Sequence, residues 1–318
     1  MSSFSLRTGA RFVAATLFVA ALAWSAGANR AVAQQAAPLQ WKFAAGETLH
    51  YRMTQNMKMG MVMGEREMGS TMRQDIDMSW AVKEVADDGS ASLEQKIDRM
   101  RMKMDMAGNS MEYDSASTAP PQGMAAMVAP VMKELTKAAF DVKMTPRGQV
   151  SEVQVPASLL DALKNSQGAA MMGELLSEKG FKQMIEKGSL VLPEKLAEGT
   201  TWNTEVKIEN PMFGSQIVTT TYAYKGSREV DGRTMEVFEP KLTMNFAGGA
   251  NSPATLKVSK QDSSGEILFD REAGRLASSK INMNMALDVT TQGNSFTQKI
   301  DQVIEMRYVS EDELKADK

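Results

Sequence analysis

Methionine thioethers are the side chains of this sequence whose type and spacing could do chemistry. Thirteen of the chain's 27 methionines lie between Met53 and Met111, and many of them fall on every second residue. Thioether sulfur is a soft ligand that suits Cu(I). Alternate residues of a strand share a face and lie roughly 6.5–7 Å apart at Cα, so flexible methionine side chains there could converge. Cu(I) binding is therefore one chemistry that the pattern permits.

The same methionines also suit apolar and redox roles. Methionine is unbranched and polarizable, so it fills irregular core space, and it also lines surfaces that accept apolar chains of varied shape. Reversible sulfoxide formation would make it a sink for oxidants. In a second, similar stretch the corresponding positions are Leu242 and Phe246, which preserve an apolar face but not a metal site. We therefore expect an apolar role, without a metal or a cofactor.

The predicted ligand site is an apolar lining on the inner side of curved sheets and their covering helices. We expect its occupant to be a lipid or another apolar molecule, or a partner protein of the cell envelope. The alternative is a structural envelope protein with a filled core and no ligand. The predicted lining residues are Met57, Met59, Met61, Met102, Met104, Met171, Met172, Leu176, Phe181, Met244, Phe246, Met283 and Met285.

Enzymatic chemistry has little support in the sequence. The single histidine, His50, lies in an alternating stretch beside Tyr51, and the chain has no cysteine and no Gly-x-Ser-x-Gly elbow, so neither a serine nor a cysteine triad can be assembled from motifs. Phosphate loops, dinucleotide fingerprints and zinc-ligand spacings are also absent. We expect a structural or surface histidine and a protein that is not an enzyme.

The first 33 residues have the organisation of a secretory signal. Arg7 and Arg11 precede an apolar run over residues 12–24, and Ala31-Val32-Ala33 fits the small-x-small cleavage rule. The run is short for a membrane span, although an uncleaved anchor is the alternative. Cleavage removes three arginines and leaves a mildly acidic chain, which argues against nucleic acid as a partner. We expect export to the periplasm or the extracellular space, with no membrane span after cleavage.

Period-two alternation and turn residues predict a mainly β protein with curved, half-barrel-like antiparallel sheets. Turn signals include Asp88-Gly89, Arg147-Gly148, Asp231-Gly232, Ser264-Gly265 and Gly293-Asn294. The predicted strands are 47–63, 68–85, 90–106, 139–145, 149–154, 200–209, 215–228, 233–246, 255–261, 265–270, 275–290 and 295–309.

A helical insertion is expected to pack on the concave side of the sheets. Residues 107–122 are small, polar and Pro-rich, which predicts a loop. Apolar residues then recur at helical spacing over 124–138, where Pro130 should kink or split the helix. A second helical stretch is predicted over 157–187.

The chain contains two similar stretches, which predict two related β units over 34–155 and 192–309, joined by a helical segment over 156–191. The residues 310–318 form a charged tail. In the first unit, Leu93 and Ile97 alternate on odd numbers before Met100 to Met106 alternate on even ones. In the second unit, Met235 and Val237 give way to Leu242 and Met244 in the same manner. A change of parity requires a bulge or a sharp bend, and such bends favour curved sheets.

Three segments resemble a family of exported bacterial proteins of unknown function. They are Leu-Pro-Glu-Lys-Leu-Ala-Glu-Gly-Thr-Thr-Trp over 192–202, Tyr-Ala-Tyr-Lys-Gly over 222–226 with the turn at Asp231-Gly232, and Phe-Asp-Arg-Glu-Ala-Gly-Arg-Leu over 269–276. The resemblance covers most of the mature chain, but that family brings no established activity or catalytic residue. In architecture the predicted fold also resembles periplasmic lipoprotein carriers, which implies a curved sheet and helices around a hydrophobic cavity.

Overall fold

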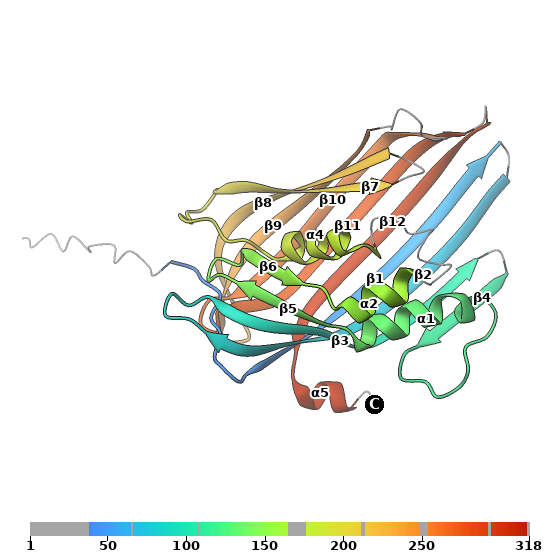
Figure 1. The fold of residues 1–318 in the computed structure, drawn as a ribbon. Coiled ribbons are helices and arrows are strands. Elements are labelled where there is room, and N and C mark those ends of the chain that lie inside the picture. The colour runs from blue at the N-terminus through green and yellow to red at the C-terminus, as the bar shows by residue number, and fades with distance from the viewer. Residues whose placement is uncertain are drawn as a thin grey trace, which may run out of the picture. The chain divides into compact units, whose positions relative to one another are not determined.

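The computed structural model describes residues 38–64, 66–106, 108–164, 176–210, 214–247, 254–291 and 294–316 (Figure 1). They belong to one structural unit, Pro38–Lys318. The predicted signal sequence, residues 1–33, lies outside the described residues, and so do Met171 and Met172 of the predicted lining.

Twelve strands within the described residues form one antiparallel sheet with the order β6-β5-β3-β2-β1-β12-β11-β10-β9-β8-β7, and β4 pairs with β3. The sheet is open and curved, with helices on its concave side, which confirms the predicted fold class (Figure 1). The strands are β1 (Thr48–Met63), β2 (Arg66–Val85), β3 (Ala91–Met106), β4 (Asn109–Asp114), β5 (Ala139–Met144), β6 (Val150–Gln154), β7 (Thr201–Asn210), β8 (Gly214–Val230), β9 (Arg233–Ala247), β10 (Ala254–Asp270), β11 (Arg275–Thr291) and β12 (Asn294–Val309).

Four helices lie within the described residues: α1 (Met124–Lys137), α2 (Ala157–Lys164), α4 (Glu178–Gly188) and α5 (Glu311–Ala316). α1 continues through Pro130 as one element, so the predicted split does not occur. It buries the small residues Ala125 and Ala129 and leaves Met127 exposed. α5 has no buried residue.

The predicted change of parity in the first unit is confirmed. Between β2 and β3 the register shifts where Met78 faces Ile97 and Asp77 faces Arg99, which leaves Asp98 as an extra residue. In the second unit the shift lies in β8 rather than β9, between Tyr224 and Ser227. Gly226 lies in that interval with a φ of 92°, a conformation that glycine adopts without steric cost. The bulge therefore forms in the strand that carries the glycine.

Two predictions about turns and loops are wrong. The loop predicted over 107–122 contains β4, whose Met111 faces Met104 of β3, because pairing with β3 overrides a composition typical of loops. The turn predicted at Ser264-Gly265 does not exist, and one strand, β10, runs through it. A Cβ at Gly265 would lie 2.7 Å from the Lys280 carbonyl oxygen and 2.8 Å from Pro240 Cγ. That glycine permits a close approach of neighbouring strands.

The main core occupies one end of the sheet. There Leu49 and Tyr51 of β1 are fully buried in the same cluster as Leu159 of α2 and Phe181 of α4. We define the inner face as the sheet face that carries Leu49 and Tyr51, and the outer face as the opposite one. The helices α2 and α4 cover the inner face at this end.

The segment before β1 ties this core together. Trp41 donates its indole N–H to the Leu190 carbonyl oxygen at 3.1 Å, and its ring meets Phe269 edge-on at 5.2 Å between centroids. The backbone N–H of Trp41 donates to the Pro146 carbonyl oxygen at 2.7 Å. These contacts bring residues from four distant parts of the chain into one junction.

Gly148 is predicted to be indispensable to this junction. Gly46 and Gly148 share a φ of 85°, but a Cβ at Gly46 meets open space, whereas one at Gly148 would lie 2.2 Å from the Leu190 carbonyl oxygen and 2.6 Å from Trp41 Nε1. G46A should therefore cost only the strain of the left-handed backbone, about 1–2 kcal/mol. G148A should cost about 1–3 kcal/mol more, because it also overpacks the junction. Urea unfolding measures both variants, and equal losses would show that the junction does not depend on close approach at Gly148.

Candidate functional site

Four methionines from four adjacent strands lie in one row across the inner face. Met57 of β1 faces Met72 of β2, Met72 faces Met104 of β3, and Met104 faces Met111 of β4. Directly opposed residues in an antiparallel sheet point to the same face, with Cβ atoms about 4.5–5.5 Å apart. We call Met57, Met72, Met104 and Met111 the methionine row.

Glutamine amides lie between the methionines of this face. Met59 of β1 faces Ile300 of β12, which faces Met285 of β11. The Gln298 amide donates to the Met59 sulfur at 3.8 Å, and the Gln216 amide donates to the Met244 sulfur at 3.1 Å. These polar groups are uncharged, so the face is a mixture of thioethers, amides and hydrocarbon.

We call the neighbouring strands β3, β2, β1, β12 and β11 the five central strands. Beyond the main core, their inner face carries no charged side chain within the described segments 53–61, 68–76, 100–106, 281–289 and 296–304. The charged residues of these segments, such as Lys58, Arg73 and Asp301, have the opposite parity and belong to the outer face. The inner residues are Met53, Gln55, Met57, Met59, Met61, Met68, Ser70, Met72, Gln74, Ile76, Met100, Met102, Met104, Met106, Ile281, Met283, Met285, Leu287, Val289, Phe296, Gln298, Ile300, Gln302 and Ile304.

Two small apolar clusters occupy this half of the inner face. In the first, Met102 and Met111 are buried with Ala125 of α1, and Met72, Met104, Tyr113 and Val128 pack against them. In the second, Met285, Leu287 and Val289 are buried, and Met244, Phe246, Leu256, Val258, Phe296 and Ile300 pack against them. Both clusters are separate from the main core.

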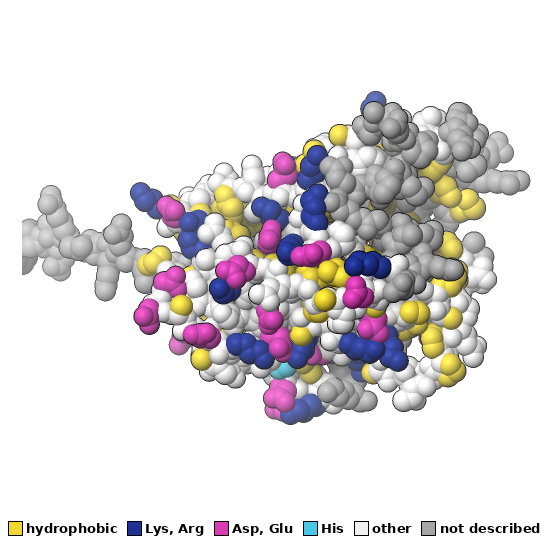
Figure 2. Space-filling view, viewed as in Figure 1, with side chains coloured by type: hydrophobic (Ala, Val, Ile, Leu, Met, Phe, Trp, Pro, Cys, Tyr) yellow, Lys and Arg dark blue, Asp and Glu magenta, His cyan; other side chains and the backbone are white. Residues whose placement is uncertain are grey.

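Part of the methionine surface is exposed. The relative solvent exposure is 46% for Met68 on β2, 42% for Met106 on β3 and 72% for Met127 on α1. Figure 2 shows hydrophobic side chains gathered on the surface around the place that α1 and β4 occupy in Figure 1. An apolar surface of this kind commonly marks an interaction site.

The predicted lining residues separate into two locations. Met57, Met59, Met61, Met102, Met104, Met283 and Met285 lie on the inner face of the five central strands, and Met244 and Phe246 join the second small cluster. Phe181 belongs instead to the main core, 5.7 Å from the Phe140 ring, and Leu176 packs against the same core. Sequence reasoning missed Met111, because it lies in the segment that was expected to be a loop.

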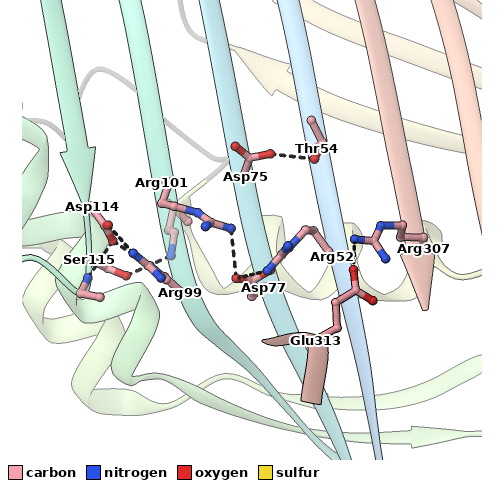
Figure 3. Close-up of polar contacts among 12 residues, drawn as sticks. Arg52, Thr54, Asp75, Asp77, Arg99, Arg101, Asp114, Ser115, Arg307 and Glu313 are labelled. Carbon is pink, nitrogen blue, oxygen red and sulfur yellow. Dashed lines mark hydrogen bonds and ion pairs between the residues drawn. The ribbon is translucent and has the colours of Figure 1, made fainter. Parts of the chain in front are cut away.

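The outer face is held together by ion pairs across strands (Figure 3). Arg52 Nε lies 2.6 Å from Asp77 Oδ1, and Arg101 Nη2 lies 3.2 Å from Asp77 Oδ2. Arg99 binds Asp114 of β4 through two nitrogens at 3.1 and 2.7 Å. The hydrogen bond from Arg99 is the main reason that the pKa of Asp114 lies below its usual range. Arg307 of β12 pairs with Glu313 of α5, which fixes that helix to the same face.

His50 lines a cavity of about 840 Å³ on the outer face, together with Asp98, Arg99 and Leu314. Its Nδ1 atom is buried without a hydrogen-bond partner. No described side chain therefore orients this imidazole through Nδ1, as the acid of a triad would. Within the described residues, no group of three or more His, Cys, Asp and Glu side chains is placed to hold a metal ion.

Glu236 of β9 is a fully buried carboxylate whose oxygens are all occupied. It accepts hydrogen bonds from the Tyr224 hydroxyl, the Ser227 hydroxyl and Arg271 Nε. Burial raises the pKa of Glu236, but the three hydrogen bonds outweigh burial and hold this pKa below its usual range. The group stabilises the bulged corner of β8 and β9 and has no access to a substrate.

The fold should lose stability at acidic pH partly through Glu236. The pKa of Glu236 is about 4.3 in the unfolded chain and lower in the folded protein. The ionised carboxylate therefore stabilises the fold fully above the unfolded-state pKa. This stabilisation is lost as the pH falls through the folded-state pKa. E236Q should lower the free energy of unfolding at pH 7 by about 2–3 kcal/mol and flatten its dependence on pH below about 5. Chemical unfolding at several pH values measures this.

E239Q is the matched control for E236Q. Glu239 lies on the same strand, but it is exposed and pairs with Lys225 at the surface, so its loss should cost about 0.5 kcal/mol. Equal effects of E236Q and E239Q would contradict the assigned role of Glu236.

No described helix is long and apolar enough to cross a membrane.

Comparison with known proteins identifies a family but no activity. The model of a family of unknown function, DUF6263, matches residues 88–302. No curated protein matches the chain significantly in sequence.

Solved structures with some similarity to the chain have very low identity. DynF, from the dynemicin biosynthesis pathway of Micromonospora chersina, has 8% identity over 87% of each chain and a TM-score of 0.23. An outer membrane channel from Pseudomonas putida F1 has 6% identity over 85% of this chain and 98% of that one, with a TM-score of 0.24. A putative outer membrane lipoprotein-sorting protein domain from Vibrio parahaemolyticus has 10% identity over 84% and 90%, with a TM-score of 0.14. Scores of this size establish no shared fold.

Proposed function

Because the chain belongs to DUF6263, a family of unknown function, we infer its role from its own residues. We propose that it is an exported, non-enzymatic protein that binds an apolar ligand on its inner face. The ligand is a lipid or another molecule with a long hydrocarbon chain. The binding surface is the charge-free half of the inner face, including the partly exposed Met57, Met59 and Met283.

The absence of charge on this surface is the observation that carries the proposal. A hydrocarbon chain gains free energy in proportion to the apolar area that it removes from water, about 25 cal/mol per Å². A charged side chain on the same surface would lose its hydration when the ligand bound, which costs free energy. Across the five central strands beyond the main core, the described inner residues present no such group, so the partly exposed residues of this face can contact a ligand without burying a charge.

Methionine and glutamine give this surface properties that aliphatic residues would not. Methionine side chains adapt to ligands of different shape because they are unbranched and have three rotatable bonds. Gln55, Gln74, Gln298 and Gln302 place amides within the apolar surface. A few polar groups in a mainly apolar site are typical of small-molecule binding sites, where they orient a polar group of the ligand.

Export is proposed from the first 33 residues. Their basic start, apolar run and small-x-small site are typical of a secretory signal. Fractionation of cells that express the full chain, with N-terminal sequencing of the product, tests this part of the proposal. A product that remains in the cytoplasm with its first 33 residues intact would contradict it.

A charge placed on the inner face should weaken binding. Met283 and Asn284 are neighbours on β11 that point to opposite faces, since Met283 faces Gln302 on the inner side and Asn284 faces Asp301 on the outer side. A fluorescent fatty acid should bind the signal-free protein saturably. M283K should weaken that binding about tenfold, because the lysine must be desolvated under the ligand. N284K should leave it unchanged.

The stability of both variants should be measured alongside binding by urea unfolding. The inner side chain of Met283 is only partly buried, so M283K should remain folded. Absence of saturable binding to the unmodified protein would favour the alternative of a structural protein whose role lies on its outer face. Extraction of lipid from protein purified from its own cell envelope then identifies the natural ligand.

A further inference from the structure

Three members of the methionine row, Met57, Met72 and Met104, place thioether sulfurs on three consecutive strands without an intervening residue of another type. Met72 is the central member, since it faces Met57 on one side and Met104 on the other. No described register shift interrupts β1, β2 or β3 near these positions. The backbone therefore fixes the three side chains side by side on one face.

Packing also brings thioethers of this region together. Met72 and Met104 are half-buried and pack against the buried Met102 and Met111, under Ala125 of α1. Opposed Cβ atoms lie about 4.5–5.5 Å apart, and the methionine side chain has enough rotatable bonds to bring neighbouring sulfurs onto one ion. Because Met72 and Met104 are not fully buried, an ion can reach them from solvent.

The other half of the same face shows that packing does not require methionine here. In the second small cluster, Leu287 and Val289 are buried with Met285, and Leu256 and Phe296 pack against them. Both small clusters lie on the same face of the same sheet. Aliphatic and aromatic side chains can therefore pack on this face, so packing alone does not require the methionines of the row.

We propose that Met57, Met72 and Met104 form a binding site for a soft monovalent metal ion, Cu(I), through their three thioether sulfurs. Met111, at the end of the row, supplies a fourth sulfur. Soft thioether ligands suit Cu(I) and are poor ligands for Mg²⁺ or Ca²⁺, which require oxygen. A single positive charge is also the smallest charge that a metal ion can bring to this charge-free face. This proposal does not rest on the proposed function, although Met57 belongs to both surfaces.

The test titrates Ag(I), a soft monovalent ion that does not change oxidation state, into signal-free protein labelled with ¹³C on its methionine methyl groups. Saturation at one equivalent is expected, with the methyl signals of Met57, Met72 and Met104 shifting most. Competition with a chromogenic Cu(I) chelator then measures the affinity for Cu(I) itself. Equal shifts of all methionine signals, or no saturable binding, would overturn the proposal.

Leucine substitutions separate the site from general methionine content. Cu(I) affinity should fall at least tenfold in M57L/M72L/M104L and in M72L alone. The control M59L/M283L/M285L removes as many thioethers from the same face and should keep its Cu(I) affinity. Leucine is close to methionine in volume, so all three variants should fold. Equal loss in the control variant would contradict a defined site.

Fatty-acid binding distinguishes failure of the metal site from failure of the proposed function. The unmodified protein is titrated with the fluorescent fatty acid in the absence of metal and, separately, with Cu(I) in the absence of fatty acid. Saturable Cu(I) binding without fatty-acid binding overturns only the proposed function. Fatty-acid binding without saturable Cu(I) binding, or an unchanged Cu(I) affinity of M57L/M72L/M104L, overturns only the metal site.

Discussion

The structure depends on an unbroken register across β12, β1 and β2. β1 pairs with β2 from Thr48 to Met63 and with β12 from His50 to Val62 without a shift. Since side-chain direction alternates along a strand, this register sends the charged residues of 53–61, 68–76 and 296–304 outward and the methionines and glutamines inward. A slip of one residue would turn Lys58 inward without a partner, at a large cost in free energy. The register is fixed by that cost.

The two faces of the sheet have separate physical roles. On the outer face, Arg52, Asp77 and Arg101 form a network that joins three strands, and Arg99 joins β3 to β4. On the inner face, helices cover the main core at one end, where Leu49, Tyr51 and Phe181 are buried. The largest buried cluster lies in that core, whereas the methionine-rich half of the inner face holds two smaller clusters and several partly exposed side chains.

That half is itself asymmetric. Most inner residues of β1 to β4 in this half are methionines, whereas β10 to β12 present leucine, valine, isoleucine and phenylalanine together with Met283 and Met285. Both sets are apolar and pack into clusters of similar size, so burial of area alone does not distinguish them. The two sets differ in side-chain chemistry, because methionine is flexible and carries a polarizable sulfur. One face of the sheet therefore has a thioether-rich part and a mainly hydrocarbon part.

The sequence by itself determined most of the strands, most of their inner residues and the bulge in β3, because alternation of period two is a local signal. Tertiary structure decided which strands are neighbours, above all β1 with β12, since that pairing joins opposite ends of the chain. It also decided that 109–114 is a strand, which places Met111 beside Met104, and that Gly265 permits close approach to Pro240 and Lys280 instead of a turn. The methionine row could not be read from spacing within one strand, because its members come from four strands whose register only long-range pairing fixes.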